Sequence, residues 1–413
     1  MEFIKFIIYV SIYVGLVATS FFILSFLSNK KKEVKLLSDD ELLTVSVIIP
    51  AYNEEKSIAK TINSILNSDY PANKFEVIVV DDGSKDKTLE IARAFENKRV
   101  KIFTKPNGGK ASALNFGISK AKGEIIFTMD ADTHVDPSSM KKMVRLFNQD
   151  DIVSVTPAML TTNPETILQR VQYMEYMLGL FLRKAFASLD AIYISPGAFS
   201  AYRKVFFDKY GGYKVGNITE DLEMSLRIQS HGFIIQNCPE ALVYTIAPRK
   251  FKELMVQRRR WYFGLIKNTI QYKHILSKKY GDLGAFVFPI AWISTFFAIF
   301  IAGFMLVKAI LNLNKEMIFL QTINFHLFNQ IDINLFAIER FFFLLFTDPV
   351  FWFVFIFMIL SAVYVKYASK KIGKISGLFF NLPIFFLLFS TLYSFWWIIS
   401  IIHALFSKDV EWR

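Results

Sequence analysis

Three stretches of the chain contain no Lys, Arg, Asp or Glu and are almost entirely apolar: residues 6–28, 283–307 and 378–406. A helix rises about 1.5 Å per residue, so each stretch is long enough to cross a hydrocarbon core of about 30 Å. We therefore expect a membrane-spanning helix in each of them.

A fourth apolar stretch, residues 341–365, is interrupted by Asp348 and Pro349. An Asp at the N-cap followed by Pro at the first helical position starts a helix. The sequence therefore predicts a fourth span from Pro349 to about Tyr367. Residues 335–346 then become an amphipathic or re-entrant segment at the membrane interface.

Lysines set the expected orientation of these spans. Lys30, Lys31 and Lys32 follow the first stretch, which favours an uncleaved anchor over a signal peptide. Basic residues next to spans stay in the cytoplasm, and a second basic group lies around residues 366–374. We expect a multi-pass protein of the plasma membrane with a large cytoplasmic domain and both termini outside.

Short apolar runs separated by helical spacings fill the region between the first two spans. Strands are predicted over residues 45–51, 75–80, 100–103 and 124–129, and the segments between them show helical periodicity. This alternation predicts an α/β fold with a mostly parallel sheet. Ligands of such sheets bind beyond the carboxyl ends of the strands.

Composition narrows the class of protein. A chain that is 53% hydrophobic and 16% aromatic is not disordered, and the single cysteine, Cys238, excludes a disulfide framework or a Cys-rich metal site. The net charge of +12 suits nucleic acid, a membrane surface or an anionic substrate. Because the basic residues cluster beside the spans, we expect no nucleic-acid partner.

Acidic residues follow two of the predicted strands. Asp81 and Asp82 end the second strand, and Asp130 and Asp132 follow the fourth. Such carboxylates repel one another unless a cation relieves them, and Mg²⁺ or Mn²⁺ does so together with substrate phosphates. A solvated acidic turn is the alternative. The chain has neither G-x-G-x-x-G after the first strand nor G-x-x-x-x-G-K-[ST], which argues against nicotinamide cofactors and P-loop chemistry.

Several short motifs occur in a fixed order along the predicted domain. They are residues 50–55 (PAYNEE), 80–84 (VDDGS), 109–115 (GKASALN), 130–132 (DAD), 218–221 (ITED) and 257–261 (QRRRW). In this order and spacing the chain resembles the membrane-embedded family-2 glycosyltransferases, which include the synthases of poly-N-acetylglucosamine, hyaluronan, chitin and cellulose. The resemblance covers about residues 44–265 and implies a GT-A-type, Rossmann-like cytoplasmic domain flanked by transmembrane helices.

The resemblance also implies which residues bind the donor, a UDP-sugar. Asp82 would pair with the uracil ring and Tyr52 would stack on it. Asp130 would lie near the ribose, Asp132 would bind Mg²⁺ or Mn²⁺, and Lys110 would add positive charge near the nucleotide. Glu54 and Glu220 complete the substrate-binding acids.

On the acceptor side the resemblance implies that Asp221 is the general base of an inverting transfer. Thr219, Glu220 and Asp221 are equally typical of a helix N-terminus. On a helix, Gln257, Arg260 and Trp261 share one face. The resemblance implies that the Arg contacts the diphosphate and that the Trp forms the floor of the acceptor site.

Two more features lie near these motifs. Residues 195–203 (SPGAFSAYR) resemble the acceptor-side loop of the family. Arg258 and Arg259 face away from the QRRRW motif's site, and we expect them against anionic head groups together with Arg249, Lys250 and Lys252.

The function that the resemblance implies is a processive inverting synthase. It would polymerise a β-linked, N-acetylglucosamine-containing polysaccharide and pass it across the membrane. Single transfer to a ceramide- or polyprenyl-phosphate-type lipid is the alternative, so the acceptor is a glycan or a lipid. Further partners are membrane lipids and a small accessory membrane subunit. After Trp261 the chain has Tyr262-Phe263-Gly264, where many poly-N-acetylglucosamine synthases carry Ala-Gln-Gly. The sequence therefore does not determine which sugar is transferred.

Four parts are expected along the chain: an anchor (1–35), the glycosyltransferase domain (36–250), interfacial helices carrying QRRRW (251–282), and a membrane region (283–413). A scaffold or transporter with an inactive transferase domain is a third interpretation. The motif acids Asp82, Asp132 and Asp221, together with Arg260 and Trp261, argue against it.

Overall fold

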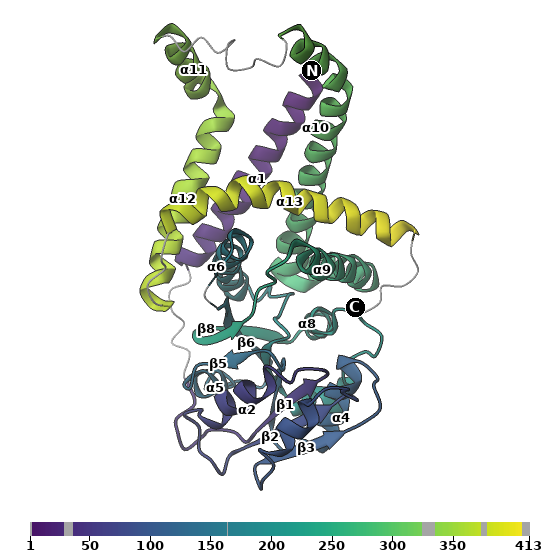
Figure 1. Cartoon of the computed structure of the whole chain (residues 1–413). Helices are drawn as coiled ribbons and strands as arrows, with labels where there is room; N and C mark the ends of the chain where they lie inside the picture. Colours follow the sequence, from purple (N-terminus) through teal and green to yellow (C-terminus); the bar gives the residue numbers. More distant parts are fainter. Residues whose placement is uncertain (1, 29–35, 163, 324–334, 373–377, 407–413) are drawn as a thin grey trace.

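A computed structural model describes residues 2–28, 36–162, 164–323, 335–372 and 378–406. An α/β domain forms one end of the molecule, and long helices project from it (Figure 1). Helices α6 and α9 lie between the sheet and the projecting helices, and α13 runs across the base of those helices.

One eight-stranded sheet organises the α/β domain, in the order β3-β2-β1-β4-β7-β6-β8-β5. Strands β3, β2, β1 and β4 are mutually parallel, β7 is antiparallel to β4 and β6, β8 is parallel to β6, and β5 is antiparallel to β8. The strands are β1 (Val45–Ala51), β2 (Phe75–Asp81), β3 (Val100–Thr104), β4 (Ile125–Met129), β5 (His134–Val135), β6 (Ile152–Thr161), β7 (Phe199–Arg203) and β8 (Ile234–Thr245).

Helices cover both faces of the sheet and connect it to the membrane region. They are α1 (Glu2–Ser28), α2 (Ile58–Leu66), α3 (Thr88–Arg93), α4 (Lys110–Lys120), α5 (Ser139–Val144), α6 (Ile167–Ser188), α7 (Lys204–Tyr210), α8 (Glu220–Ser230), α9 (Phe251–Gln271), α10 (Phe288–Thr322), α11 (Leu335–Thr347), α12 (Pro349–Ile372) and α13 (Leu378–Phe406). Short 3₁₀ turns and a π-helical turn at Leu283–Val287 join α9 to α10.

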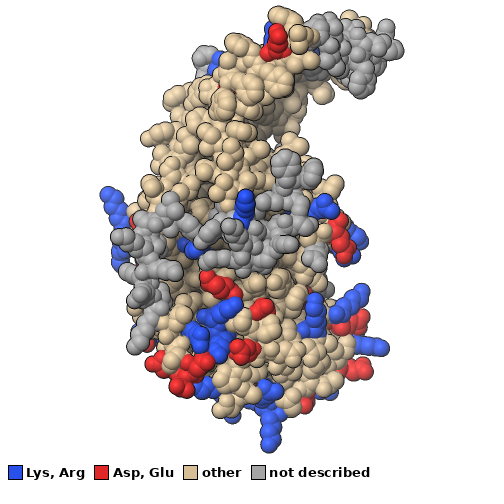
Figure 2. Space-filling view, turned by 90° about the vertical axis from the view of Figure 1, so that its left-hand side faces the viewer, with Lys and Arg blue, Asp and Glu red and all other residues tan. Residues whose placement is uncertain are grey.

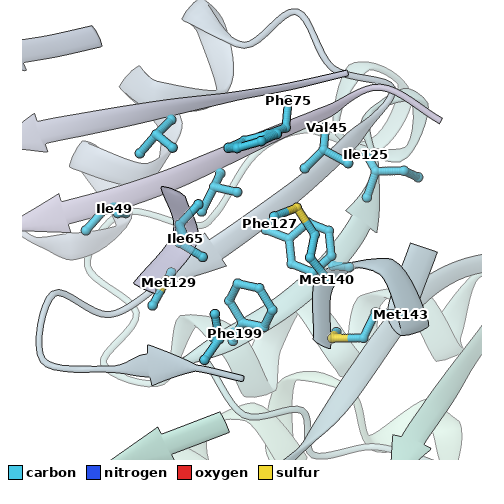
Figure 3. Close-up of a cluster of buried hydrophobic side chains, with 14 of the residues drawn as sticks. Val45, Ile49, Ile65, Phe75, Ile125, Phe127, Met129, Met140, Met143 and Phe199 are labelled. Carbon is cyan, nitrogen blue, oxygen red and sulfur yellow. The ribbon is translucent and has the colours of Figure 1, made fainter. Parts of the chain in front are cut away.

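The central strands are apolar at successive positions because both of their faces are buried. Val45, Val47 and Ile49 of β1 pack with α2 and α5, whereas Ile48 packs with α4 and α8 on the other face. Figure 3 shows the first of these cores, where side chains such as Phe127 and Met140 meet below the sheet. The mostly parallel α/β fold, its first four strands and the helices between them are confirmed.

Three described helices are long and apolar enough to cross a membrane: Phe3–Ser25, Leu283–Leu313 and Asn381–Phe406. Helices α11 and α12 are bent by 74° at their junction and add a fourth candidate only if the bent pair is one span. Asp348 caps α12 as predicted, since the Val350 N–H donates to its Oδ1 at 2.8 Å. The segment expected to be re-entrant or interfacial is α11.

Helix α13 differs from the other apolar helices in its direction. It packs against α6 and α9 of the domain and crosses the base of α1, α10 and α12 (Figure 1). On the face drawn in Figure 2, charged side chains gather over the α/β domain, and most of the described surface above it is uncharged. Lys30–Lys32 and Lys374, on which the predicted orientation rests, lie outside the described residues.

Candidate active site

The carboxyl ends of the parallel strands bring the predicted donor-side residues to one edge of the sheet. Strands β1, β2 and β4 end at Ala51, Asp81 and Met129. Tyr52, Asp82 and Asp130 therefore follow three neighbouring strands, as the sheet order requires. Tyr52 is half-buried directly after β1.

Lys110 joins acids from two different parts of the chain. Its Nζ lies 2.6 Å from Asp130 Oδ1, after β4, and 3.0 Å from Glu220 Oε1, in the first turn of α8. Burial lowers the pKa of Lys110, but the carboxylates of Asp130, Glu220 and Asp221 raise it by more, so the amine stays charged. One cation thus serves several carboxylates.

Asp221 adjoins this cluster and faces the loop before β7. Its Oδ2 accepts the Gly197 N–H at 3.0 Å, and its Oδ1 accepts the Leu222 N–H at 2.7 Å. A Cβ at position 197 would lie 3.0 Å from Asp221 Oδ2 and 3.2 Å from Lys110 Nζ. Only glycine lets the backbone approach the two side chains so closely.

The environment of Asp221 keeps part of it protonated near neutral pH. Burial and the neighbouring Glu220 carboxylate raise its pKa to about 6, although Lys110 acts in the opposite direction. A carboxylate whose pKa is shifted toward neutrality is well matched to take a proton from a hydroxyl and release it again.

Asp132 shows a similar excess of negative charge around it. Burial, Asp130 and Glu54 raise its pKa to about 6. A divalent cation would relieve this repulsion, and one or two carboxylates plus phosphate oxygens are a donor set that Mg²⁺ and Mn²⁺ accept. Among the described residues, no group of three or more His, Cys, Asp or Glu could hold a metal without such outside ligands.

Asp82 lies apart from the Lys110 cluster and has partners of its own. Its Oδ1 accepts Lys105 Nζ at 2.7 Å, and its Oδ2 accepts the Gly109 N–H at 2.8 Å. The Gly108 N–H also points at this carboxylate. Asp82 therefore holds the loop that leads into α4, and so fixes the position at which α4 begins with Lys110. Sequence reasoning missed Lys105, which has no motif to mark it.

Glu54 occupies the loop after β1 beside Asn53, a residue with φ of +56°. Its carboxylate accepts the Ser57 hydroxyl at 2.6 Å, and its N–H donates to Thr88 Oγ1 at 2.7 Å. These bonds fix the loop that carries Tyr52 and Glu54 toward Asp132.

The QRRRW helix, α9, packs against α8 just where α8 begins. Asn268 Nδ2 donates to Thr219 Oγ1 at 2.9 Å, and a Cβ at Gly264 would lie 2.2 Å from the same oxygen. Gln257, Trp261, Gly264 and Asn268 share one helical face by their spacing. This face therefore points to the start of α8, which carries Glu220 and Asp221. Gln257, Arg260 and Trp261 are all half-buried.

The prediction that Arg258 lies against lipid head groups is wrong. Its side chain is buried at 1% exposure, and its Nη1 and Nη2 lie 2.5 Å and 2.7 Å from the two carboxylate oxygens of Glu175 on α6. Sequence periodicity placed Arg258 off the Gln257 face, but it could not supply the partner from a helix so distant in sequence. Arg249 is exposed and pairs with Glu165.

A second buried charge network, absent from the sequence predictions, follows one turn along α8. Glu223 accepts Arg227, Lys214 and Tyr272 through its carboxylate. Burial raises the pKa of Glu223, but these donors outweigh it, so that the pKa lies below its usual value. Arg227 Nη1 also donates to the carbonyls of residues 210–212. The network fixes the loop before α8.

Comparison with known proteins identifies the class of this enzyme. The family model "Glycosyl transferase family 2" matches residues 46–211, which hold β1 to β4, the Lys110 loop and the Asp130–Asp132 turn. Residues 46–211 therefore form a family-2 glycosyltransferase domain, and the chain is similar to glycosyltransferases that carry it. The sequence resemblance is confirmed.

Two relatives extend the match beyond this domain. "Probable glycosyltransferase YdaM" of Bacillus subtilis (strain 168) is 27% identical over 393 residues, 90% of this chain and 86% of that protein. "Poly-beta-1,6-N-acetyl-D-glucosamine synthase" of Staphylococcus aureus (strain COL) is 30% identical over 238 residues, 56% of each chain. The match thus spans about half the length of the staphylococcal synthase.

A solved structure shares the overall arrangement. Mannosyltransferase PcManGT from Pyrobaculum calidifontis, in complex with GDP-Man and Mn²⁺, aligns over 98% of this chain and 100% of its own, with a TM-score of 0.60 and 18% identity. The likeness supports the fold, including the helices outside the catalytic domain.

Proposed function

We propose that this glycosyltransferase is a processive, inverting enzyme that uses a UDP-sugar to elongate a β-linked polysaccharide and passes the product across the membrane. N-acetylglucosamine is the sugar that the staphylococcal relative's name suggests. The observation that carries the proposal is the cluster in which Lys110 bridges Asp130 and Glu220, with Asp221 beside it.

The donor would lie along the sheet edge on the Asp132 side of this cluster. Asp132 would hold a divalent cation, and bound there the ion would offset negative charge on the diphosphate as UDP departs. The Mn²⁺ and GDP-Man of PcManGT support a metal and a nucleotide sugar in this fold. Tyr52 would stack on the base, and Asp82 would accept the uracil N–H in addition to its bonds from the loop before α4.

The acceptor would approach from the opposite side of the donor sugar. Asp221 takes the proton of the attacking hydroxyl, and the Gly197 N–H keeps its carboxylate oriented. Attack from that side inverts the anomeric centre in one displacement. Arg260 would contact the diphosphate, and Gln257 and Trp261 would receive the acceptor sugar, since an aromatic face packs well on the apolar side of a pyranose.

The membrane arrangement follows from the same geometry. We place the catalytic domain in the cytoplasm, where nucleotide sugars are made, and the N-terminus outside. The crosswise course of α13 favours α1, α10 and the bent pair α11 and α12 as the spans, with the end of α13 near the catalytic side. In this arrangement the end of α13 would lie on the cytoplasmic side, whereas the sequence predicts both termini outside.

The test is incubation of the purified protein in lipid with a panel of radiolabelled UDP-sugars, followed by sizing of the products. A ladder or a high polymer is expected from one of the sugars. A single labelled lipid would instead establish the second candidate, and no incorporation from any UDP-sugar would contradict both.

Transfer of one sugar to a lipid is the second candidate because of an apolar groove beside α9. The groove has a volume of about 280 Å³ and is lined by residues of α9, α10 and α13, including Ile266, Trp292 and Leu405. A hydrocarbon chain fits its lining.

A further inference from the structure

Arg258 is a buried cation at the junction of α6, α9 and α13. Its guanidinium carbon lies 4.5 Å from the centroid of the Trp261 ring and 5.2 Å from that of Trp396 on α13. Its two terminal nitrogens contact Glu175. The guanidinium therefore lies against one carboxylate and two indole rings, and it also has a hydrogen bond with Tyr262.

These contacts restrain the guanidinium in different ways. A two-point bond to a carboxylate fixes the orientation of the planar fork. Two nearby indole rings hold a desolvated cation by electrostatic attraction to their faces. Trp396 is also buried, at 1% exposure, so α13 closes off one side of the guanidinium.

Trp261 lies, by its spacing, on the same face of α9 as Gln257, Gly264 and Asn268, the face that packs against the start of α8. An indole can turn about its two side-chain torsions unless neighbours stop it. Arg258 supplies such a neighbour from within the same helix, and Glu175 and Trp396 hold Arg258 from two other helices. The position of the indole is thereby tied to α6 and to the membrane-facing helix α13.

We infer that Arg258, held by Glu175, is a positioning residue for Trp261 and so sets the affinity for the acceptor sugar. The inference rests on the proposed function, in which Trp261 receives the acceptor. It requires a guanidinium at position 258 itself, not merely an ion pair between α6 and α9. A purely structural ion pair would need only opposite charges on the two helices.

Exchanging the two charges separates these possibilities. The double variant Glu175→Arg/Arg258→Glu restores an ion pair between the helices but moves the guanidinium off α9. Binding of a short N-acetylglucosamine oligomer, and separately of UDP, is measured by calorimetry on full-length protein in lipid nanodiscs, so neither readout needs turnover. UDP binding reports that each variant is folded.

Single substitutions at the Arg258 site provide a second test, in which each variant removes only one of its contacts. Arg258→Lys keeps the charge but loses the planar fork, and Trp396→Leu removes one ring while leaving the ion pair. The control is Arg259→Lys, the same change on the next residue of α9, which we expect to leave both affinities within about twofold of wild type.

We expect the oligomer to bind about tenfold more weakly to Arg258→Lys, Trp396→Leu and the exchanged double variant, with UDP affinity unchanged; loss of a desolvated cation–aromatic contact has this size. Full recovery of oligomer binding in the exchanged variant would overturn the inference, as would equal losses of UDP and oligomer binding in Arg258→Lys. A wild-type protein that binds UDP but not the oligomer would also overturn it. Wild-type binding of both ligands without any sugar transfer would refute the proposed function alone.

Discussion

Helix α8 carries two sets of buried acids that lie one turn apart and differ in their charge balance. At its start, Glu220 and Asp221 share Lys110 with Asp130. One turn later, Glu223 alone receives Arg227, Lys214 and Tyr272. The first set has more acids than cations, and the second has more cations than acids.

The pKa values follow this difference. Burial and Glu220 raise the pKa of Asp221 to about 6, whereas the donors around Glu223 bring its pKa below the usual value despite burial. A buried acid whose charge is compensated by neighbouring cations, such as Glu223, fixes the local structure. A buried acid whose charge is not compensated, such as Asp221, is ready to accept a proton or a cation. The contrast within one helix thus separates the part that holds the loop from the part to which we assign the reaction.

The largest effect is expected at Asp221. Asp221→Asn removes the proton acceptor and should lower transfer about a thousandfold, within the range for loss of a general base. UDP-sugar binding should remain nearly intact because the amide keeps the shape of the side chain. Radiolabelled transfer and calorimetric donor binding check this, and unchanged turnover would remove Asp221 from its role.

Removal of divalent metal comes next. We expect EDTA to reduce transfer at least about a hundredfold, because the diphosphate would then face Asp130 and Asp132 without a compensating cation. Added Mg²⁺ or Mn²⁺ should restore the rate. Full activity in EDTA, with metal content verified by mass spectrometry, would contradict the role given to Asp132.

Substitution of Glu223, the acid with compensating cations, should lower the stability of the fold rather than the rate of transfer. Glu223→Gln leaves Arg227 and Lys214 without their buried anion, which should cost about 3 kcal/mol, or roughly 6–12 °C in melting temperature. The matched control is Glu165→Gln, because Glu165 forms an exposed pair with Arg249, at 65% and 60% side-chain exposure. That change should shift the melting temperature by about 2 °C or less. Equal shifts of the melting temperature in Glu223→Gln and Glu165→Gln would show that the buried Glu223 network stabilises the fold no more than an exposed ion pair does.

The smallest effect is a shift in pH dependence. Asp221 works as a carboxylate, so transfer should fall as the pH drops through about 6, where its raised pKa lies. Lys110 lowers that pKa, so in Lys110→Gln the acid limb of kcat/KM should move to higher pH, by roughly one unit. A limb that stays in place would show that Lys110 does not influence the base.

Local patterns in the sequence were sufficient for the first four strands and for the acids at the sheet edge, but they did not reveal β5 to β8. The runs at 45–51 and 75–80 are strands buried on both faces, and such runs are apolar at nearly every position, here with the exceptions of Ser46 and Glu76. Asp130, Glu220 and Asp221 were found because they follow an element end or lie in a motif. Their convergence on Lys110 agrees with the sheet order, since β4 lies between β1 and β7.

Pairings between distant helices could not be predicted in the same way. Glu175 on α6 and Trp396 on α13 are far from Arg258 in sequence, and nothing local to them indicates a shared contact. The direction of α13 was missed for a similar reason. Length and hydropathy qualify a helix as a span, but its direction depends on the helices it packs against, here α6 and α9.

The central claim, that the excess of carboxylates marks the cation and donor site, is tested most directly by Mn²⁺ binding in the presence of UDP, followed by electron paramagnetic resonance. Wild type and Glu223→Gln should bind the ion alike, and Asp132→Asn should bind it at least about tenfold more weakly, as expected on loss of a carboxylate ligand. Equal Mn²⁺ affinity in wild type and Asp132→Asn would contradict the claim.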